Sequence, residues 1–140
     1  MERFEVTILG CGSAKPNACH FPSAQIVNVH DKLYMIDCGE GAQIQMCRNH
    51  INFSRLDGDH CFGLIGLIST YNLLGRTSDL NIYAPNGLGE TLEVLIKAYC
   101  REMTYRVIFH SVDTKANIKI FEDHTVEIYS LPLKHRIPCC

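Results

Sequence analysis

The sequence lacks the features that mark membrane-spanning, secreted and autonomous nucleic-acid-binding proteins. No apolar run reaches the roughly 20 residues needed to cross a bilayer. Residues 1–5 lead directly into a strand-like run with no leader segment, so we expect a cytoplasmic chain with no membrane partner. The formal net charge is -2, whereas nucleic-acid binders are usually basic. A nucleic-acid substrate would therefore need a local basic patch or another segment.

Paired-cysteine motifs are also absent, although cysteine itself is frequent. The chain has eight cysteines, none of them in Cys-x-x-Cys spacing, and Cys139 and Cys140 are adjacent. An even number is compatible with disulfides, but a cytosolic chain keeps its thiols reduced. We therefore expect reduced, mostly buried cysteines rather than a disulfide framework.

Length and composition predict one globular domain over residues 1–140. A chain of 140 residues is long enough to form a real core, since a domain of about this size buries roughly two-thirds of its unfolded surface. Hydrophobic content is 46% and charged content is 20%, which is typical of a folded rather than a disordered chain.

The hydrophobic pattern predicts an α/β fold in which helices cover a mainly β layer. Alternating, β-rich stretches indicate strands at 4–9, 24–29, 33–37, 80–84, 105–109, 118–121 and 125–129, with a turn at 30–32. Apolar spacing indicates helices at 42–48, 62–74 and 90–99, and Gly75 is a natural stop for the second. A layered fold should place a strand between the first two helices, but residues 51–56 offer at most a brief edge strand.

Three short stretches carry residues that chemistry could use. Residues 10–16 begin Gly-x-Gly, but Lys15 occupies the place of the third glycine and no helix follows, so we expect a tight turn rather than a dinucleotide site. Asp37 ends a strand before a helix, where it could cap free amides. Asp59 and His60 precede the apolar helix, and a carboxylate beside an imidazole suits zinc. Such a pair in a loop is, however, more often solvated surface.

Four segments together resemble the ribonuclease Z family, which comprises tRNA 3′-processing endonucleases of the metallo-β-lactamase superfamily. The segments read ILGCGSAKP, IDCGEGAQIQ, FGLIGLISTYNLLGR and PLKHRIPCC, and the Asp-His pair precedes the third. The resemblance covers nearly all of the chain but only about the first half of the family's domain. It implies an incomplete metallo-β-lactamase-like αββα sandwich, in a homodimer that acts on precursor tRNA.

The resemblance also implies roles for four residues. In the family, two zinc ions share a bridging hydroxide that attacks a phosphodiester. Asp59 would bind zinc and act as the catalytic general base, His60 would bind the same zinc, and His135 would bind the other. Asp37 would orient the metal ligands. The remaining histidines have no such context and are expected at the surface or in the core: His20, His30, His50, His110 and His124.

The chain departs from the family where zinc should bind. The family reads His-x-His-x-Asp-His before the apolar helix, whereas Arg55 and Asp57 stand here in place of the first two histidines. Arg55 cannot bind a metal because its guanidinium stays protonated, although Asp57 could. A catalytic zinc normally needs about three protein ligands. One site therefore keeps two ligands and the other keeps one, and we expect the isolated chain to be inactive.

The missing histidines lead to a geometric hypothesis. Both flanks match the family without distortion, while the expected strand and two ligands vanish together. We therefore expect residues to be missing between Leu56 and Gly58, visible as a Cα spacing well beyond the about 3.8 Å of a trans peptide. Normal spacing would instead mean that the deletion is real, and would remove the active-enzyme interpretation for this chain.

Three functions stay open on the sequence alone. The chain is part of a zinc-dependent ribonuclease Z, an inactive shortened relative that serves as a binding or structural module, or another metallo-β-lactamase-fold hydrolase. In each case half a sandwich leaves its inner face bare, and large apolar patches rarely stay exposed. We therefore expect self-association, with the apolar helix at 64–74 as a candidate contact.

Overall fold

A computed structural model describes residues 4–13, 19–52, 56–58, 63–100 and 102–134. Within these ranges the chain forms eight strands and three helices, so the predicted α/β class is confirmed. The elements, in chain order, are β1 (Phe4–Gly10), β2 (Ala24–Val29), β3 (Lys32–Cys38), α1 (Ala42–Arg48), β4 (Leu56–Gly58), α2 (Leu64–Leu73), β5 (Leu80–Pro85), α3 (Leu88–Tyr99), β6 (Val107–Val112), β7 (Ile118–Glu122) and β8 (Glu127–Ser130). None of the described helices is long and apolar enough to cross a membrane.

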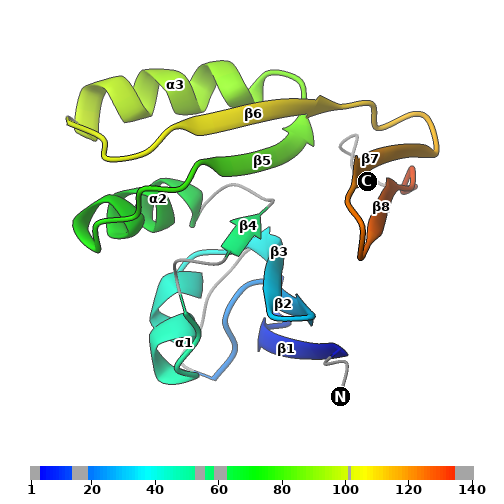
Figure 1. Ribbon diagram of the computed structural model, residues 1–140, viewed down its shortest axis with the longest axis horizontal. Helices are drawn as coiled ribbons and strands as arrows, with labels where there is room; N and C mark the ends of the chain where they lie inside the picture. Colours follow the sequence, from blue (N-terminus) through cyan, green and yellow to red (C-terminus); the bar gives the residue numbers. More distant parts are fainter. Residues whose placement is uncertain (1–3, 14–18, 53–55, 59–62, 101, 135–140) are drawn as a thin grey trace.

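The strands follow one another in space from β1 to β6 (Figure 1). The first sheet has the order β1-β2-β3-β4, in which β2 is antiparallel to both neighbours and β4 is parallel to β3. Strands β5 and β6 pair in parallel, and β7 and β8 form a separate antiparallel hairpin. The predicted turn between β2 and β3 is made by His30 and Asp31, both with positive φ, as a tight two-residue hairpin requires.

A short strand occupies the place where the sequence pattern showed none. Leu56, Asp57 and Gly58 of β4 pair one by one with Leu33, Tyr34 and Met35 of β3. The pairing of these three residues is consecutive, with no jump between Leu56 and Gly58. That residues are missing here relative to the family stays a prediction.

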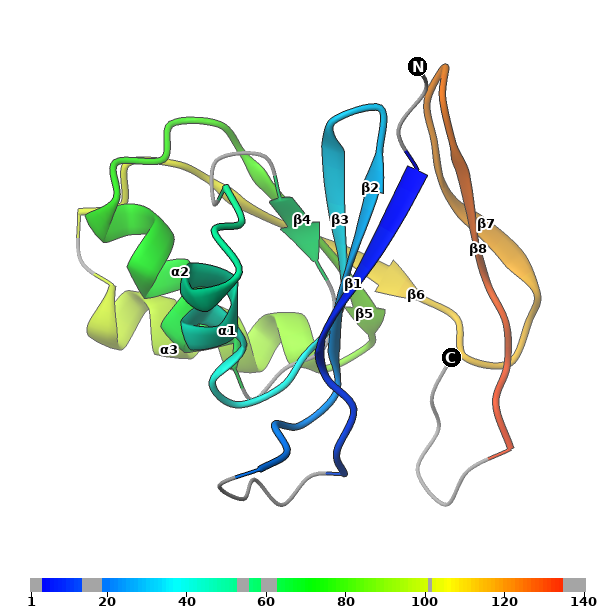
Figure 2. The same ribbon diagram turned by 90° about the horizontal axis from the view of Figure 1, so that it is seen from below.

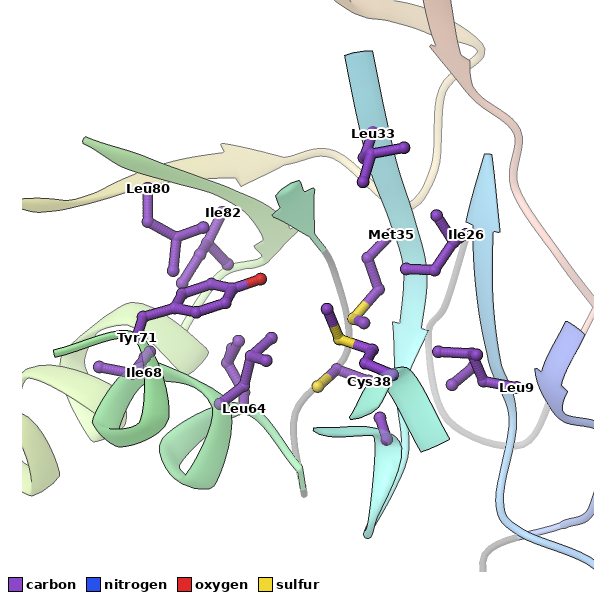
Figure 3. Packing of buried hydrophobic residues seen from close by; sticks show 14 of the residues in the cluster. Leu9, Ile26, Leu33, Met35, Cys38, Leu64, Ile68, Tyr71, Leu80 and Ile82 are labelled. Atoms are coloured by element: carbon purple, nitrogen blue, oxygen red, sulfur yellow. The ribbon is translucent and has the colours of Figure 1, made fainter. Parts of the chain in front are cut away.

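The core lies between the sheet and the helices. Figure 3 shows Ile26 and Met35 from the sheet pointing toward Leu64 and Tyr71 of α2. Helix α2 is buried at Leu64, Leu67, Ile68 and Tyr71, because a helix that is apolar all round belongs in a core. Only its end is exposed, with Leu73 at 83% and Leu74 at 63%. The proposed role of this helix as a contact surface is thus limited to its last turn.

The face of the sheet opposite the helices is only partly covered. Figure 2 shows the three helices on one side of the strands and the β7–β8 hairpin on the other. Between the sheet and the hairpin lies an open, mainly apolar groove of about 380 Å³, lined by residues that include Val27, Tyr34 and Ile128. Phe4, Val6, Ile8 and Ile36 remain exposed on the described surface, as expected for half of a sandwich.

Aromatic and charged contacts hold the hairpin against the sheet. The ring of Phe121 in β7 lies 5.9 Å from that of Tyr34 and 6.1 Å from that of Tyr83, measured between centroids. The Lys32 Nζ donates to Asp123 Oδ2 at 2.5 Å, at the hairpin's turn. The hydrogen bond from Lys32, and then those from Thr125, hold the pKa of the Asp123 carboxyl well below its ordinary value of 3.8.

Acid should release this hairpin contact. Because the folded state lowers the pKa of Asp123, the contact is fully present above the ordinary value of 3.8 and weakens as pH falls through the lower folded-state value. We expect the protection of amides in β7 and β8, relative to their intrinsic exchange rates, to begin to fall below about pH 4 and to be lost as pH falls through the lower folded-state pKa of Asp123. Asp123→Asn should weaken protection at neutral pH and flatten this acid dependence. Glu93→Gln, which removes the exposed Glu93–Lys97 pair on α3, is the matched control, and an equal effect of both variants would contradict the assignment.

Candidate functional site

Asp37 lies at the carboxyl end of β3, on an irregular part of the ladder. Ala24 pairs with Cys38 and Gln25 pairs with Ile36, so Asp37 is an extra residue with no partner position on β2. Its φ of 60° lies in the left-handed region, which Asp tolerates better than most residues. Bulges of this kind re-aim a side chain and often lie next to active sites, so the irregular register sets the direction of the Asp37 side chain.

Ser23, just before β2, binds the Asp37 carboxylate, and Gln25 of β2 in turn binds Ser23. The Ser23 hydroxyl donates to Asp37 Oδ2 at 2.6 Å, and the Gln25 amide donates to Ser23 Oγ at 2.9 Å. Helix α1 has Gly41 as its N-cap residue, which supplies no side-chain cap. The alternative that Asp37 binds free amides at this corner stays a prediction. Its role in orienting metal ligands stays a prediction.

Backbone contacts gather three segments at the same corner. The Gly63 N–H, just before α2, donates to the Cys38 carbonyl at 2.8 Å, and the Gly39 N–H donates to the Ser23 carbonyl at 3.0 Å. A Cβ on Gly63 would lie 2.8 Å from the Cys38 oxygen and closer still to the Gly39 oxygen. Only glycine fits at position 63, and this close approach fixes the start of α2 against the end of β3.

The Gly-x-Gly stretch forms one side of this corner. The Gly12 N–H donates to the Phe21 carbonyl at 2.8 Å, and the Ser23 N–H donates to the Gly12 carbonyl at 3.1 Å. In its described part, residues 10–13, the stretch runs beside residues 21–23, and the rest of the predicted turn, residues 14–16, lies outside the described residues. These two hydrogen bonds hold the end of β1 beside Ser23, whose hydroxyl binds Asp37.

Three of the four predicted site residues, namely Asp59, His60 and His135, lie outside the described residues. Their flanks are nevertheless informative. Gly58, before residues 59–62, pairs with Met35 of β3, and Gly63, after them, is bonded to Cys38 of β3. Both flanks of the Asp-His segment are thus attached to the strand that carries Asp37.

The other predicted histidines and cysteines take no part in a site within the described residues. His20, His30, His50 and His124 are exposed, and His110 stacks on Tyr83 at 4.4 Å between ring centroids. The described part of the chain contains no group of three or more His, Cys, Asp or Glu side chains that could hold a metal. Its five described cysteines are free thiols, of which Cys11, Cys19 and Cys47 are exposed and Cys38 and Cys100 are buried, while the other three cysteines lie outside the described residues.

Ser23 and Gln25 are the functional candidates that the sequence pattern missed. The sequence did contain a signal for these two residues, because the hairpin turn at 30–31 sets the register of β2 on β3. That register places residues 23–25 beside residues 36–38. A polar residue at position 23 could therefore have been expected near Asp37.

Comparisons with known proteins show which sequences this chain resembles. No protein-family model matches the chain. Ribonuclease Z of Bacteroides fragilis is 51% identical over 148 aligned positions, which cover 100% of this chain and 49% of the relative. Ribonuclease Z of Bacteroides thetaiotaomicron is 52% identical, covering 100% of this chain and 47% of the relative. The 148 aligned positions are eight more than the 140 residues of this chain, so the relatives have residues that it lacks.

Solved structures agree with these matches. The short form of human tRNase Z superposes with a TM-score of 0.86 at 25% identity, covering 99% of this chain and 62% of that protein. The metallo-β-lactamase fold protein YhfI from Bacillus subtilis superposes with a TM-score of 0.61 at 18% identity and covers 91% of this chain and 56% of that protein, which shows the fold alone. The chain spans about half the length of the curated relatives it matches. Over that span it belongs to the ribonuclease Z family, with the metallo-β-lactamase fold.

Proposed function

We propose that the chain is the N-terminal half of a zinc-dependent ribonuclease Z, and that this half lacks a complete active site. The whole enzyme would hydrolyse a phosphodiester at the 3′ end of precursor tRNA. The observation that carries the proposal is the identity to ribonuclease Z along the whole chain. Residues 1–140 would form one partial domain, and activity would require the part of the relatives that this chain does not match.

The donor set of this chain does not fit two zinc ions. Asp59 and His60 would serve one ion and His135 the other, whereas a catalytic zinc normally takes about three protein ligands. Asp57, which stands in place of a family histidine, belongs to the short strand β4. The eight additional aligned positions of the relatives support the loss of a segment. We therefore assign no catalytic step to zinc in the chain as it stands.

Asp37 and Ser23 would contribute to the site by positioning other groups and not as zinc ligands. In the whole enzyme Asp59 would act as the catalytic base, and Asp37 would be a positioning residue. The bulge at Asp37 and the hydrogen bond from Ser23 fix the carboxylate before any ligand arrives. Such outer contacts typically change metal affinity by about 10–100-fold when they are lost.

Most contacts to tRNA would come from the part of the relatives that this chain does not match. Several cations in the described residues are already paired with carboxylates: Lys32 with Asp123, Lys97 with Glu93, Arg106 with Asp79, and Lys119 with Glu122 and Glu127. Paired cations attract phosphate less strongly than free ones. Binding of an RNA backbone by this half alone should therefore be weak.

We also propose a cytoplasmic homodimer. Free thiols at the five described cysteines suit a reducing compartment. The bare apolar face of the sheet favours association, since large apolar patches are usually covered.

A specific observation favours a second candidate function. The uninterrupted register of β4 and the eight-position shortfall suit a shortened, inactive relative that serves as a binding or structural module. The third possibility, another hydrolase of the same fold, has less support because the curated relatives considered above carry the name ribonuclease Z.

The function can be tested on a restored chain. The segment at 56–58 would be replaced by the longer segment of a full-length relative, and the relative's remaining half would be joined after residue 140. We expect this protein to cleave precursor tRNA at its 3′ end, and Asp59→Ala to lower the rate by on the order of 10³-fold. His124→Ala, at an exposed histidine, should leave the rate unchanged. Cleavage of small ester or lactam substrates in place of tRNA would refute the proposal.

A further inference from the structure

One asparagine of this chain is followed by glycine, and the pair lies at an exposed turn. Asn86 and Gly87 connect β5 to α3, and both residues are exposed. A Cβ added to Gly87 would meet nothing within 4 Å, so solvent reaches the turn from this side. Every other asparagine in the sequence is followed by a residue that carries a side chain.

The absence of a side chain at position 87 matters because an asparagine amide can react with the backbone nitrogen that follows it. A side chain on the next residue obstructs the approach of that nitrogen to Cγ, whereas glycine leaves it open and has the widest choice of φ and ψ. Within the part of the chain that the structure describes, the Gly87 N–H donates to no backbone carbonyl. The nitrogen therefore need not break such a bond before it reacts.

The structure places a hydrogen-bond donor on the carbonyl group that would be attacked. The Ser111 hydroxyl, on β6, donates to Asn86 Oδ1. Ala84, two residues before Asn86, pairs with Ser111 in the parallel ladder of β5 and β6, so the two strands set this contact (Figure 1). Attack at Cγ moves negative charge onto Oδ1, and a donor already aimed at such an oxygen stabilises the charged intermediate.

We propose that Asn86 is a site of spontaneous deamidation, and that Ser111 promotes the reaction. The Gly87 nitrogen loses its proton to solvent and forms a bond to Cγ of Asn86. The Cγ–Nδ2 bond then breaks, and ammonia leaves with a proton taken from solvent. Water opens the resulting cyclic imide at either carbonyl, which gives aspartate or isoaspartate. In sum, water is consumed and ammonia is released, with no oxidation or reduction.

The modified turn differs from the native turn in charge and in backbone length. Either product places a carboxylate just before α3, where the first backbone N–H groups of a helix have no partner within it and favour a negative charge. Isoaspartate also adds a carbon to the backbone between β5 and α3. The chain thus becomes heterogeneous with age at this junction, independently of any activity on tRNA.

Peptide mapping of aged protein tests the proposal. The folded 140-residue chain is incubated at neutral pH, sampled over time, digested, and analysed by mass spectrometry with fragmentation. We expect residue 86 to gain about 1 Da faster than any other asparagine, in separable aspartate and isoaspartate forms. The rate should rise with pH, because the attacking nitrogen must lose its proton.

Variants at Ser111 separate its role from the effect of the local sequence alone. Ser111→Ala should slow the mass gain at least about threefold in the folded chain, and should have no effect in urea, where the hydroxyl no longer lies on Oδ1. Ser111→Thr keeps a hydroxyl and should keep the native rate. Ser78→Ala, which removes an exposed hydroxyl before the opposite end of β5, is the matched control.

Two results would overturn the proposal. If residue 86 gains mass no faster than the other asparagines, Asn86 is not the site. If folded Ser111→Ala is modified at the native rate or faster, Ser111 does not promote the reaction, even where Asn86 is modified.

Discussion

The 140-residue chain should cleave precursor tRNA on the order of 10³-fold more slowly than a full-length ribonuclease Z, or more slowly still. A loss of this size corresponds to about 4 kcal/mol of transition-state stabilisation. It is expected because, by the family resemblance, Arg55 and Asp57 would stand in place of two histidine ligands, and because the relatives are about twice as long. The measurement is single-turnover cleavage of end-labelled precursor tRNA with zinc supplied in excess.

Two additions separate the causes of this loss. Supplying the relative's remaining half as a second polypeptide should not restore cleavage, because the missing histidines belong to this half. Restoring the longer segment at 56–58 together with that half should restore it. Metal-dependent cleavage at the tRNA 3′ end by the unaltered chain, within tenfold of the full-length enzyme, would contradict the account.

Gly63→Ala should destabilise the chain strongly. A Cβ at this position would collide with the Gly39 carbonyl oxygen and lie 2.8 Å from that of Cys38. Both obstacles are backbone atoms, so β3 and α2 must move apart to admit a methyl group. Overpacking of this kind costs about 1–3 kcal/mol or more, a large share of the 5–15 kcal/mol that holds a typical domain together. Urea unfolding, followed by circular dichroism, measures the loss.

Gly66→Ala on the same helix is the control for this variant. Its Cβ would lie 3.0 Å from the Gln43 Nε2, the end of a side chain that can shift. Alanine also favours a helix interior over glycine by about 1 kcal/mol. The stability of Gly66→Ala should therefore be close to that of the native chain or above it. Equal losses in both variants would show that the junction at Gly63 has no special constraint.

Local pattern predicted most of the fold. Strand β2 has the predicted bounds, and α1 does too, because alternation and helical spacing act over a few residues. The strand predicted at 105–109 instead begins at Val107. Tyr105 is buried and donates its hydroxyl proton to the Ile68 carbonyl at 2.8 Å. A contact with a distant helix overrode the local pattern there.

The candidate site was less predictable, because its geometry depends on contacts between segments. The pattern identified Asp37 but not the bulge that aims it or the Ser23 hydroxyl that binds it. The partner assigned to Asp37 depends on hairpin register, which a single strand does not reveal. The roles of Asp59, His60 and His135 rest on family resemblance and stay predictions.

Zinc content of the purified 140-residue chain tests the central claim most directly. The chain would be equilibrated with excess zinc, passed through a desalting column, and analysed by plasma mass spectrometry with native mass spectrometry as a second readout. Since its three candidate donors are too few for two ions, we predict fewer than two tightly held zinc ions per chain, and a gain toward two in the restored full-length form. Two zinc ions retained per chain by the unaltered protein would contradict the claim.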